Sequence, residues 1–229
     1  MTGQPLDLLG PDDRSTLRER CGALLDQDET QLGAALIGSL PTHEARSENV
    51  LRQWSAIATE FGAELARPGE HPDIDELAAA FGLRVVHSGG GVTPSRLTLA
   101  QYASRPPTVR IFDDTMLLAQ SLVELLDWQA WFPAGRIRDA AVCHEVVHRL
   151  LSGAPGDVLK KRLGHVAFRL GPVVFRGHVL GADEVAAHSY ARVRCRLPKS
   201  PLLLTAALAE ASDFLDFGRA PLVHSGKGV

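Results

Sequence analysis

Residues 144 to 148 read HEVVH, a pair of histidines with a glutamate directly after the first. If residues 138 to 151 form a helix, His144 and His148 lie one turn apart on the same face. Their imidazoles can then bind a single cation, as paired histidines do in catalytic zinc sites. Glu145 is rotated by about 100° from His144, so it can reach a water on the metal and serve as its general base. The pattern therefore predicts a metal site with catalytic Glu145.

The alternative is a helix that carries its histidines by coincidence. The residues around the motif are nearly all apolar and include Ala140, Ala141, Val142, Val146 and Val147. We expect such a helix to be buried, where three ionisable groups are costly unless something satisfies them. A bound metal would satisfy them, so the metal site is the preferred interpretation.

A catalytic zinc site needs a third protein ligand and a position open to water. Glu184 is the best candidate, because it lies near the start of a predicted helix among apolar neighbours. A glutamate that only caps this helix is the alternative. His188 follows one turn later on the same face, as a substitute ligand or as a partner of a ligand. Tyr190 and Arg192, further along, are candidates for stabilising a transition state.

The elements that would position these residues follow from hydrophobic periodicity and from Gly and Pro breaks. Strands are expected at 83–87, 95–102 and 107–112, and a hairpin or extended lid at 165–181. Helices are expected over residues 14–40, 47–67, 115–132, 138–151, 183–197 and 201–217, with a short one just before the first strand. The predicted fold class is α+β, mainly helical with a small three-stranded sheet.

Composition restricts the function classes. The chain has 229 residues and a net charge of −3, so it has no general attraction to nucleic acid or to anionic membranes. A helix-turn-helix in the first third is conceivable, but that segment is acidic and lacks a basic recognition helix, so we expect no direct nucleic-acid binding. We also expect no membrane span and no secretory signal. Three scattered cysteines favour a reducing cytoplasm, and the Ala-, Gly- and Arg-rich composition favours a bacterial source.

Two stretches, HEVVH and ADEVAAHSYA, together resemble the ImmA/IrrE family of bacterial zinc metallopeptidase-like proteins, which belong to the gluzincin group. IDELAAAFGLRVV and TVRIF resemble the helix and strands that precede the active-site helix in that family. The resemblance covers roughly residues 72 to 200. It implies Glu184 as the third zinc ligand and Glu145 as the general base. The sequence departs from the family pattern at two positions, with His188 in place of Asn or Asp and Tyr190 in place of Phe.

We expect three parts in the chain: a helical amino-terminal region (1–68), a zinc metallopeptidase-like domain (69–217) and a flexible tail (218–229). The expected function is zinc-dependent hydrolysis of an amide or peptide bond, with a peptide or protein as substrate. A regulatory protein that acts on a transcriptional repressor is a second hypothesis. A biosynthetic metalloenzyme acting on a small amide is a third, and a pocket narrowed by residues 154–181 would favour it.

Overall fold

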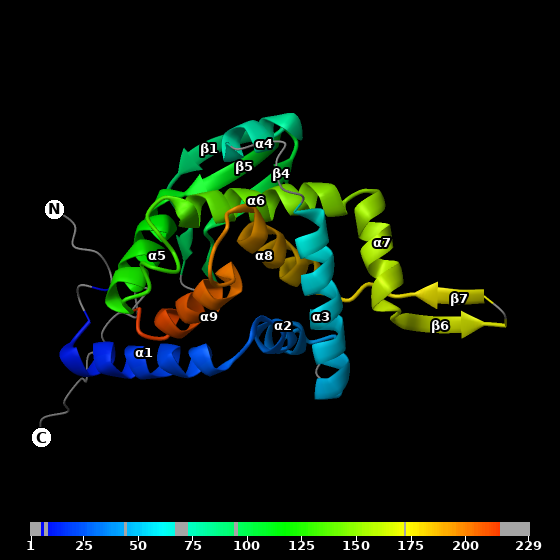
Figure 1. Ribbon diagram of the computed structural model, residues 1–229, viewed down its shortest axis with the longest axis horizontal. Helices are drawn as coiled ribbons and strands as arrows, with labels where there is room; N and C mark the ends of the chain where they lie inside the picture. The colour runs from blue at the N-terminus through cyan, green and yellow to red at the C-terminus, as the bar shows by residue number, and fades with distance from the viewer. Residues whose placement is uncertain are drawn as a thin grey trace, which may run out of the picture.

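The computed structural model describes residues 6, 9–43, 45–66, 73–93, 96–171 and 173–215, with backbone alone at 173–176. Helices make up most of this part of the chain, and a three-stranded sheet lies along one side of it (Figure 1). The expected α+β class with a small sheet is confirmed at this level.

The sheet contains β1 (Arg84–Ser88), β4 (Ala100–Ser104) and β5 (Pro107–Phe112) in the order β1-β5-β4. β5 pairs with β1 in parallel and with β4 antiparallel. Val109 and Ile111 of the central strand are fully buried, as the alternating pattern of a strand packed on helices requires. β4 is consequently an edge strand, and it runs beside the helix that carries HEVVH.

Ten helical segments are present in the described chain. They are α1 (Pro11–Ala23), the 3-10 turn η2 (Leu24–Asp26), α2 (Glu29–Gly38), α3 (Glu48–Leu65), α4 (Ile74–Ala80), α5 (Asp113–Leu125), α6 (Arg136–Leu151), α7 (Ala154–Leu163), α8 (Ala182–Arg194) and α9 (Pro201–Ser212). Two further ladders complete the fold. Short β2 (Val92–Thr93) pairs with β3 (Arg96–Leu97), and β6 (Val166–Leu170) forms a projecting hairpin with β7 (Val173–Arg176) (Figure 1).

Three elements differ from the sequence predictions. The single strand expected at 95–102 is divided into β3 (Arg96–Leu97), which pairs with β2 (Val92–Thr93), and β4, which belongs to the main sheet. The helix expected over 115–132 ends at Leu125, and the turns that follow bury Trp128 and Phe132 instead of continuing the helix. α7 was not predicted. Its start follows the Gly153 break directly, and Pro155 occupies the first turn, where a missing N–H costs nothing. The hairpin expected within 165–181 is present as β6 and β7.

Two hydrophobic clusters form the core, and the amino-terminal helices enter both. Leu17 and Cys21 of α1 belong to the larger cluster, together with the sheet, α5, α6 and α9. Trp54 and Phe61 of α3 belong to the smaller one, with residues of α7 and α8. The described residues before 68 therefore share their core with the rest of the chain. The tail expected at 218–229 lies outside the described residues.

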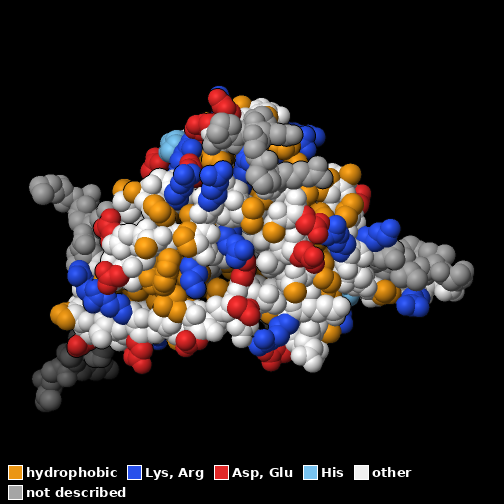
Figure 2. Space-filling model, in the orientation of Figure 1, with side chains coloured by type: hydrophobic (Ala, Val, Ile, Leu, Met, Phe, Trp, Pro, Cys, Tyr) orange, Lys and Arg blue, Asp and Glu red, His pale blue; other side chains and the backbone are white. Residues whose placement is uncertain are grey.

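None of the helices in the described part of the chain is both long enough and apolar enough to cross a membrane. Positive and negative side chains are interspersed over the face shown in Figure 2, in keeping with the small net charge of −3.

Candidate metal centre

Helices α6 and α8 pack against each other and supply five ionisable side chains to one place. The HEVVH motif lies within α6, so His144 and His148 are one turn apart on the face toward α8. Val142, Val146 and Val147 of α6 are fully buried and fix the helix in the core. This arrangement leaves the two histidines at the edge of the core, facing a cavity.

α8 begins immediately after Gly181, whose φ of +83° is left-handed and favours glycine. This sharp entry places Glu184 in the first turn of α8, beside the two histidines of α6. His188 lies one turn further along the same helix, and its ring centroid is 4.5 Å from that of His144.

The three predicted ligands form a small triangle. His144 Nε2 lies 3.0 Å from Glu184 Oε2 and 3.1 Å from His148 Nε2. His148 Nε2 lies 3.4 Å from Glu184 Oε1. In a tetrahedral zinc site with bonds of about 2.0–2.1 Å, ligand atoms lie about 3.3–3.4 Å from one another. The donor set, two imidazoles and a carboxylate, and its spacing both fit a zinc ion.

Contacts within the triangle shift the pKa values of Glu184 and His148. Burial would raise the pKa of Glu184, but hydrogen bonds from His144 and His148 outweigh it and hold that pKa well below its usual range. Burial would lower the pKa of His148, but its contact with Glu184 outweighs this and raises the pKa. Glu184 is therefore ionised near neutral pH, which is the state that a metal ligand needs.

His188 is the closest competitor of Glu184 as a ligand. One of its ring nitrogens lies within 4.8 Å of ligand atoms of both His144 and Glu184. Burial and the neighbouring His144 lower the pKa of His188 well below its usual value, so its ring is neutral. The Nδ1 atoms of His144 and His188 are buried, and no described residue hydrogen-bonds to either.

Glu145 points from α6 toward the edge strand of the sheet. Its Oε2 accepts a hydrogen bond of 2.7 Å from the backbone N–H of Tyr102 on β4. The side chain also lines the cavity beside His144 and His148. The strand thus holds one carboxylate oxygen of a side chain that borders the cavity.

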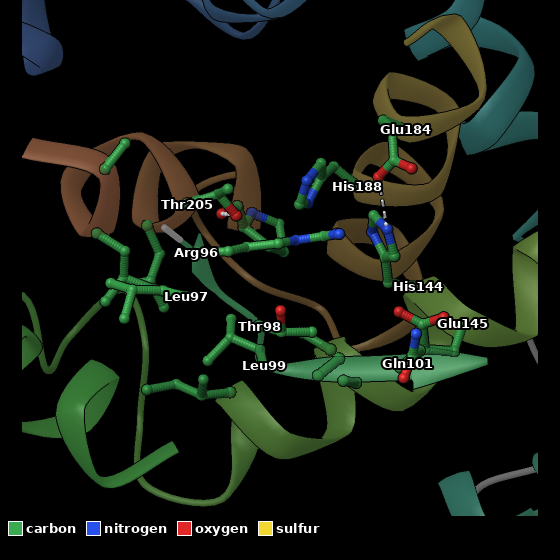
Figure 3. A pocket seen from close by; sticks show the side chains of 18 of the residues that line it. Arg96, Leu97, Thr98, Leu99, Gln101, His144, Glu145, Glu184, His188 and Thr205 are labelled. Atoms are coloured by element: carbon green, nitrogen blue, oxygen red, sulfur yellow. Dashed lines mark hydrogen bonds and ion pairs between the residues drawn. The ribbon is translucent and has the colours of Figure 1, made fainter. Parts of the chain in front are cut away.

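The cavity at these residues has a volume of about 690 Å³. Its lining comes from β3, β4, α6, the start of α8 and α9, and Figure 3 shows the side chains that converge on it. No described residue of 154–181 lines this cavity, so that segment does not narrow it. Described residues of that segment line a second cavity of about 560 Å³ on the other side of His148. The wall opposite the sheet is α9.

Tyr190 and Arg192 do not reach this cavity. Tyr190 is buried beside Cys143, and burial together with that thiol raises its pKa to about 12. Arg192 forms an ion pair of 2.7 Å with Glu29 on α2. The expected transition-state role of Tyr190 and Arg192 therefore finds no support, because Tyr190 packs beside Cys143 and Arg192 is paired with Glu29.

Sequence reasoning missed Arg96 on β3 and the wall formed by α9. Arg96 extends across the cavity toward His144 and His188 (Figure 3). Neither residue type nor spacing signals this, since Arg96 lies 48 residues before His144 in a short polar strand. Only the tertiary fold brings them together.

Comparison of the chain with protein-family models, curated proteins and solved structures gave no match.

Proposed function

We propose that the protein is a zinc-dependent hydrolase of the metallopeptidase type that cleaves an amide bond. The observation that carries the proposal is the triangle formed by His144, His148 and Glu184, whose ligand atoms lie 3.0 to 3.4 Å apart. Zinc bound there would polarise a carbonyl and lower the pKa of a water. The similarity of HEVVH and ADEVAAHSYA to the ImmA/IrrE family supports the same assignment.

The chain's own residues account for the proton transfers of such a reaction. The water oxygen bonds to the carbonyl carbon while Oε1 of Glu145 takes its proton. The carbon–nitrogen bond then breaks, and the same carboxyl group returns the proton to the leaving nitrogen. The Tyr102 N–H holds Oε2 of Glu145 throughout, so the carboxylate does not have to reorient between the two transfers. The products are a carboxylic acid and an amine.

The size of the cavity favours a short substrate. Its volume of about 690 Å³ falls in the range of small-molecule sites, about 300–1,000 Å³. The α9 wall faces the β3–β4 edge across this space and limits its width. We therefore propose that the substrate is a small amide or the end of a peptide chain.

Glu145→Gln tests the proposal, because glutamine keeps the shape of the side chain but cannot accept the proton. We expect the variant to keep its zinc and its melting temperature, and to lose about 100-fold or more of its turnover. Turnover is measured on a mixture of N-acylated di- and tripeptides in ¹⁸O-labelled water, with mass spectrometry of the released acid. Glu60→Gln, at an exposed position of α3, is the matched control and should remain active. Activity of Glu145→Gln within tenfold of the unmutated protein would contradict the assigned base.

A further inference from the structure

Arg96 is the only lysine or arginine among the described residues that line the cavity at the metal centre. It projects from β3 into the space between the sheet and α9, and its guanidinium is directed toward His144 and His188 (Figure 3). No described carboxylate forms an ion pair with it. A planar, permanently charged group thus faces the place where a substrate would lie.

The acidic side chains of the same cavity are already engaged. Glu145 is held by the backbone of β4, and Glu184 by the two histidines of α6. Asp213, at the far end, forms an ion pair of 3.2 Å with Arg20 of α1. Arg96 therefore has no neutralising partner among the residues that the structure describes, and a substrate anion is its natural complement.

The remainder of the lining is largely apolar. Leu97 and Leu99 come from the β3–β4 segment, while Leu204 and Leu208 come from α9. Arg96 itself is exposed, but a bound substrate would cover its guanidinium, and the apolar walls would then make the charge–charge contact stronger than the same contact in water. They also provide room for a hydrophobic side chain beside the anion.

We propose that Arg96 binds a free carboxylate on the amine side of the scissile amide, so that the substrate is an N-acylated hydrophobic amino acid. The inference rests on the proposed amide hydrolysis. An α-carboxylate is separated from the scissile nitrogen by a single carbon, so it stays close to the ligand triangle, toward which Arg96 points. The same chemistry occurs in a simple N-acyl amino acid and at the carboxyl end of a peptide.

The test compares N-acetyl-Ala-Leu with its carboxyl-terminal amide, which differ only in the charge at the carboxyl end. We expect the unmutated protein to hydrolyse the acid with a kcat/KM about 10- to 100-fold higher, the worth of one charged hydrogen-bonded contact. Arg96→Gln should lower the rate on the acid to that on the amide and leave the amide rate unchanged. Arg96→Lys should keep part of the preference, because it keeps the charge but not the two-pronged geometry. Arg110→Gln, an exposed arginine on β5 outside the cavity, is the control.

Calorimetric binding to Glu145→Gln protein separates this inference from the proposed hydrolysis. Tighter binding of the acid than of the amide, lost in the double variant with Arg96→Gln, supports carboxylate recognition even if the unmutated protein hydrolyses neither compound. Acid-selective binding without hydrolysis would contradict the proposed hydrolase activity but not the role of Arg96. Equal binding of acid and amide, or binding of neither, would overturn the role of Arg96. An equal loss of rate on both compounds in Arg96→Gln would also overturn it, because it would place the guanidinium on the reacting carbonyl.

N-acetyl-Leu and N-acetyl-Ala-Ala-Leu distinguish the two sources of this chemistry. Preference for the shorter compound indicates a small N-acyl amino acid as substrate, and preference for the longer one indicates a peptide end. Either preference agrees with Arg96 as the carboxylate anchor, provided that Arg96→Gln reduces hydrolysis of both acids.

Discussion

Gly62 of α3 lies against the backbone of α8 between the two residues that α8 contributes to the metal centre. A Cβ at this position would lie 2.1 Å from the carbonyl oxygen of Ala186 and 2.8 Å from its carbonyl carbon. Because backbone atoms within a helix cannot rotate away, Gly62→Ala must push the two helices apart by roughly 1 Å to reach ordinary contact distance. Ala186 lies midway between Glu184 and His188, so this displacement also distorts the ligand triangle.

The expected loss in the free energy of unfolding follows from this overlap. Overpacking of a core typically costs about 1–3 kcal/mol, and the upper end applies where backbone is the obstacle. Alanine regains about 0.5–1 kcal/mol of helix propensity over glycine. The net loss is about 2 kcal/mol, which lowers the melting temperature by about 4–8 °C for a chain of this size. We also expect the zinc affinity to fall about tenfold or more, which is the loss typical of mutating a residue that orients a metal ligand.

Gly22→Ala on α1 is the matched control, since a Cβ there meets nothing within 4 Å. It should leave zinc affinity unchanged and keep or slightly raise the melting temperature. Thermal unfolding by circular dichroism and a competitive zinc titration measure the two effects. If Gly62→Ala melted as high as Gly22→Ala, the close packing of α3 on α8 would be refuted.

Three further predictions follow from the site and the core. Glu184→Ala should weaken zinc binding at least tenfold, and His188→Ala should weaken it less; the reverse order in a zinc titration would make the third ligand a histidine. Zinc in 100-fold excess over its Kd should stabilise the metal-free protein by about 2.7 kcal/mol, and an unchanged melting temperature would contradict a native site. The free energy of unfolding should fall as the pH rises above about 9. Burial, and to a lesser extent Glu210, raises the pKa of Cys21 to about 11, and burial also raises the pKa of Tyr190. Both groups therefore stay protonated in the folded state at a pH where they ionise in the unfolded chain. A melting temperature that is flat from pH 8 to 11 would speak against this.

Local patterns predicted those parts of the fold that depend on local sequence. The apolar run around HEVVH, with Gly153 close behind it, gives α6 from periodicity alone, and the alternation in PTVRIF gives β5. The end of α5 at Leu125 was missed, because residues 126–132 keep a helix-like composition while tertiary burial of Trp128 and Phe132 determines their conformation.

The site was predictable only where its residues share a helix or a motif. His144 and His148 lie on one helix, so their spacing fixes their relation. Glu184 was a candidate from its place among apolar residues of a predicted helix, and the resemblance to a known pattern supported it, since nothing local connects α8 with α6. Arg96 and the α9 wall could not be foreseen, because they reach the cavity through packing of segments far apart in the sequence. Arg192 was misplaced for the same reason, as its partner Glu29 lies on a distant helix.

Zinc content of the purified protein tests the central claim most directly. The chain is dialysed against metal-free buffer and analysed by plasma emission spectrometry, alongside His144→Ala and the Gly22→Ala control. The account predicts close to one zinc ion per chain in the unmutated protein and in Gly22→Ala, and almost none in His144→Ala. Two results would contradict a metal centre at HEVVH. One is an unmutated protein that contains almost no zinc and takes up none when zinc is added; the other is an equal zinc content in His144→Ala and the unmutated protein.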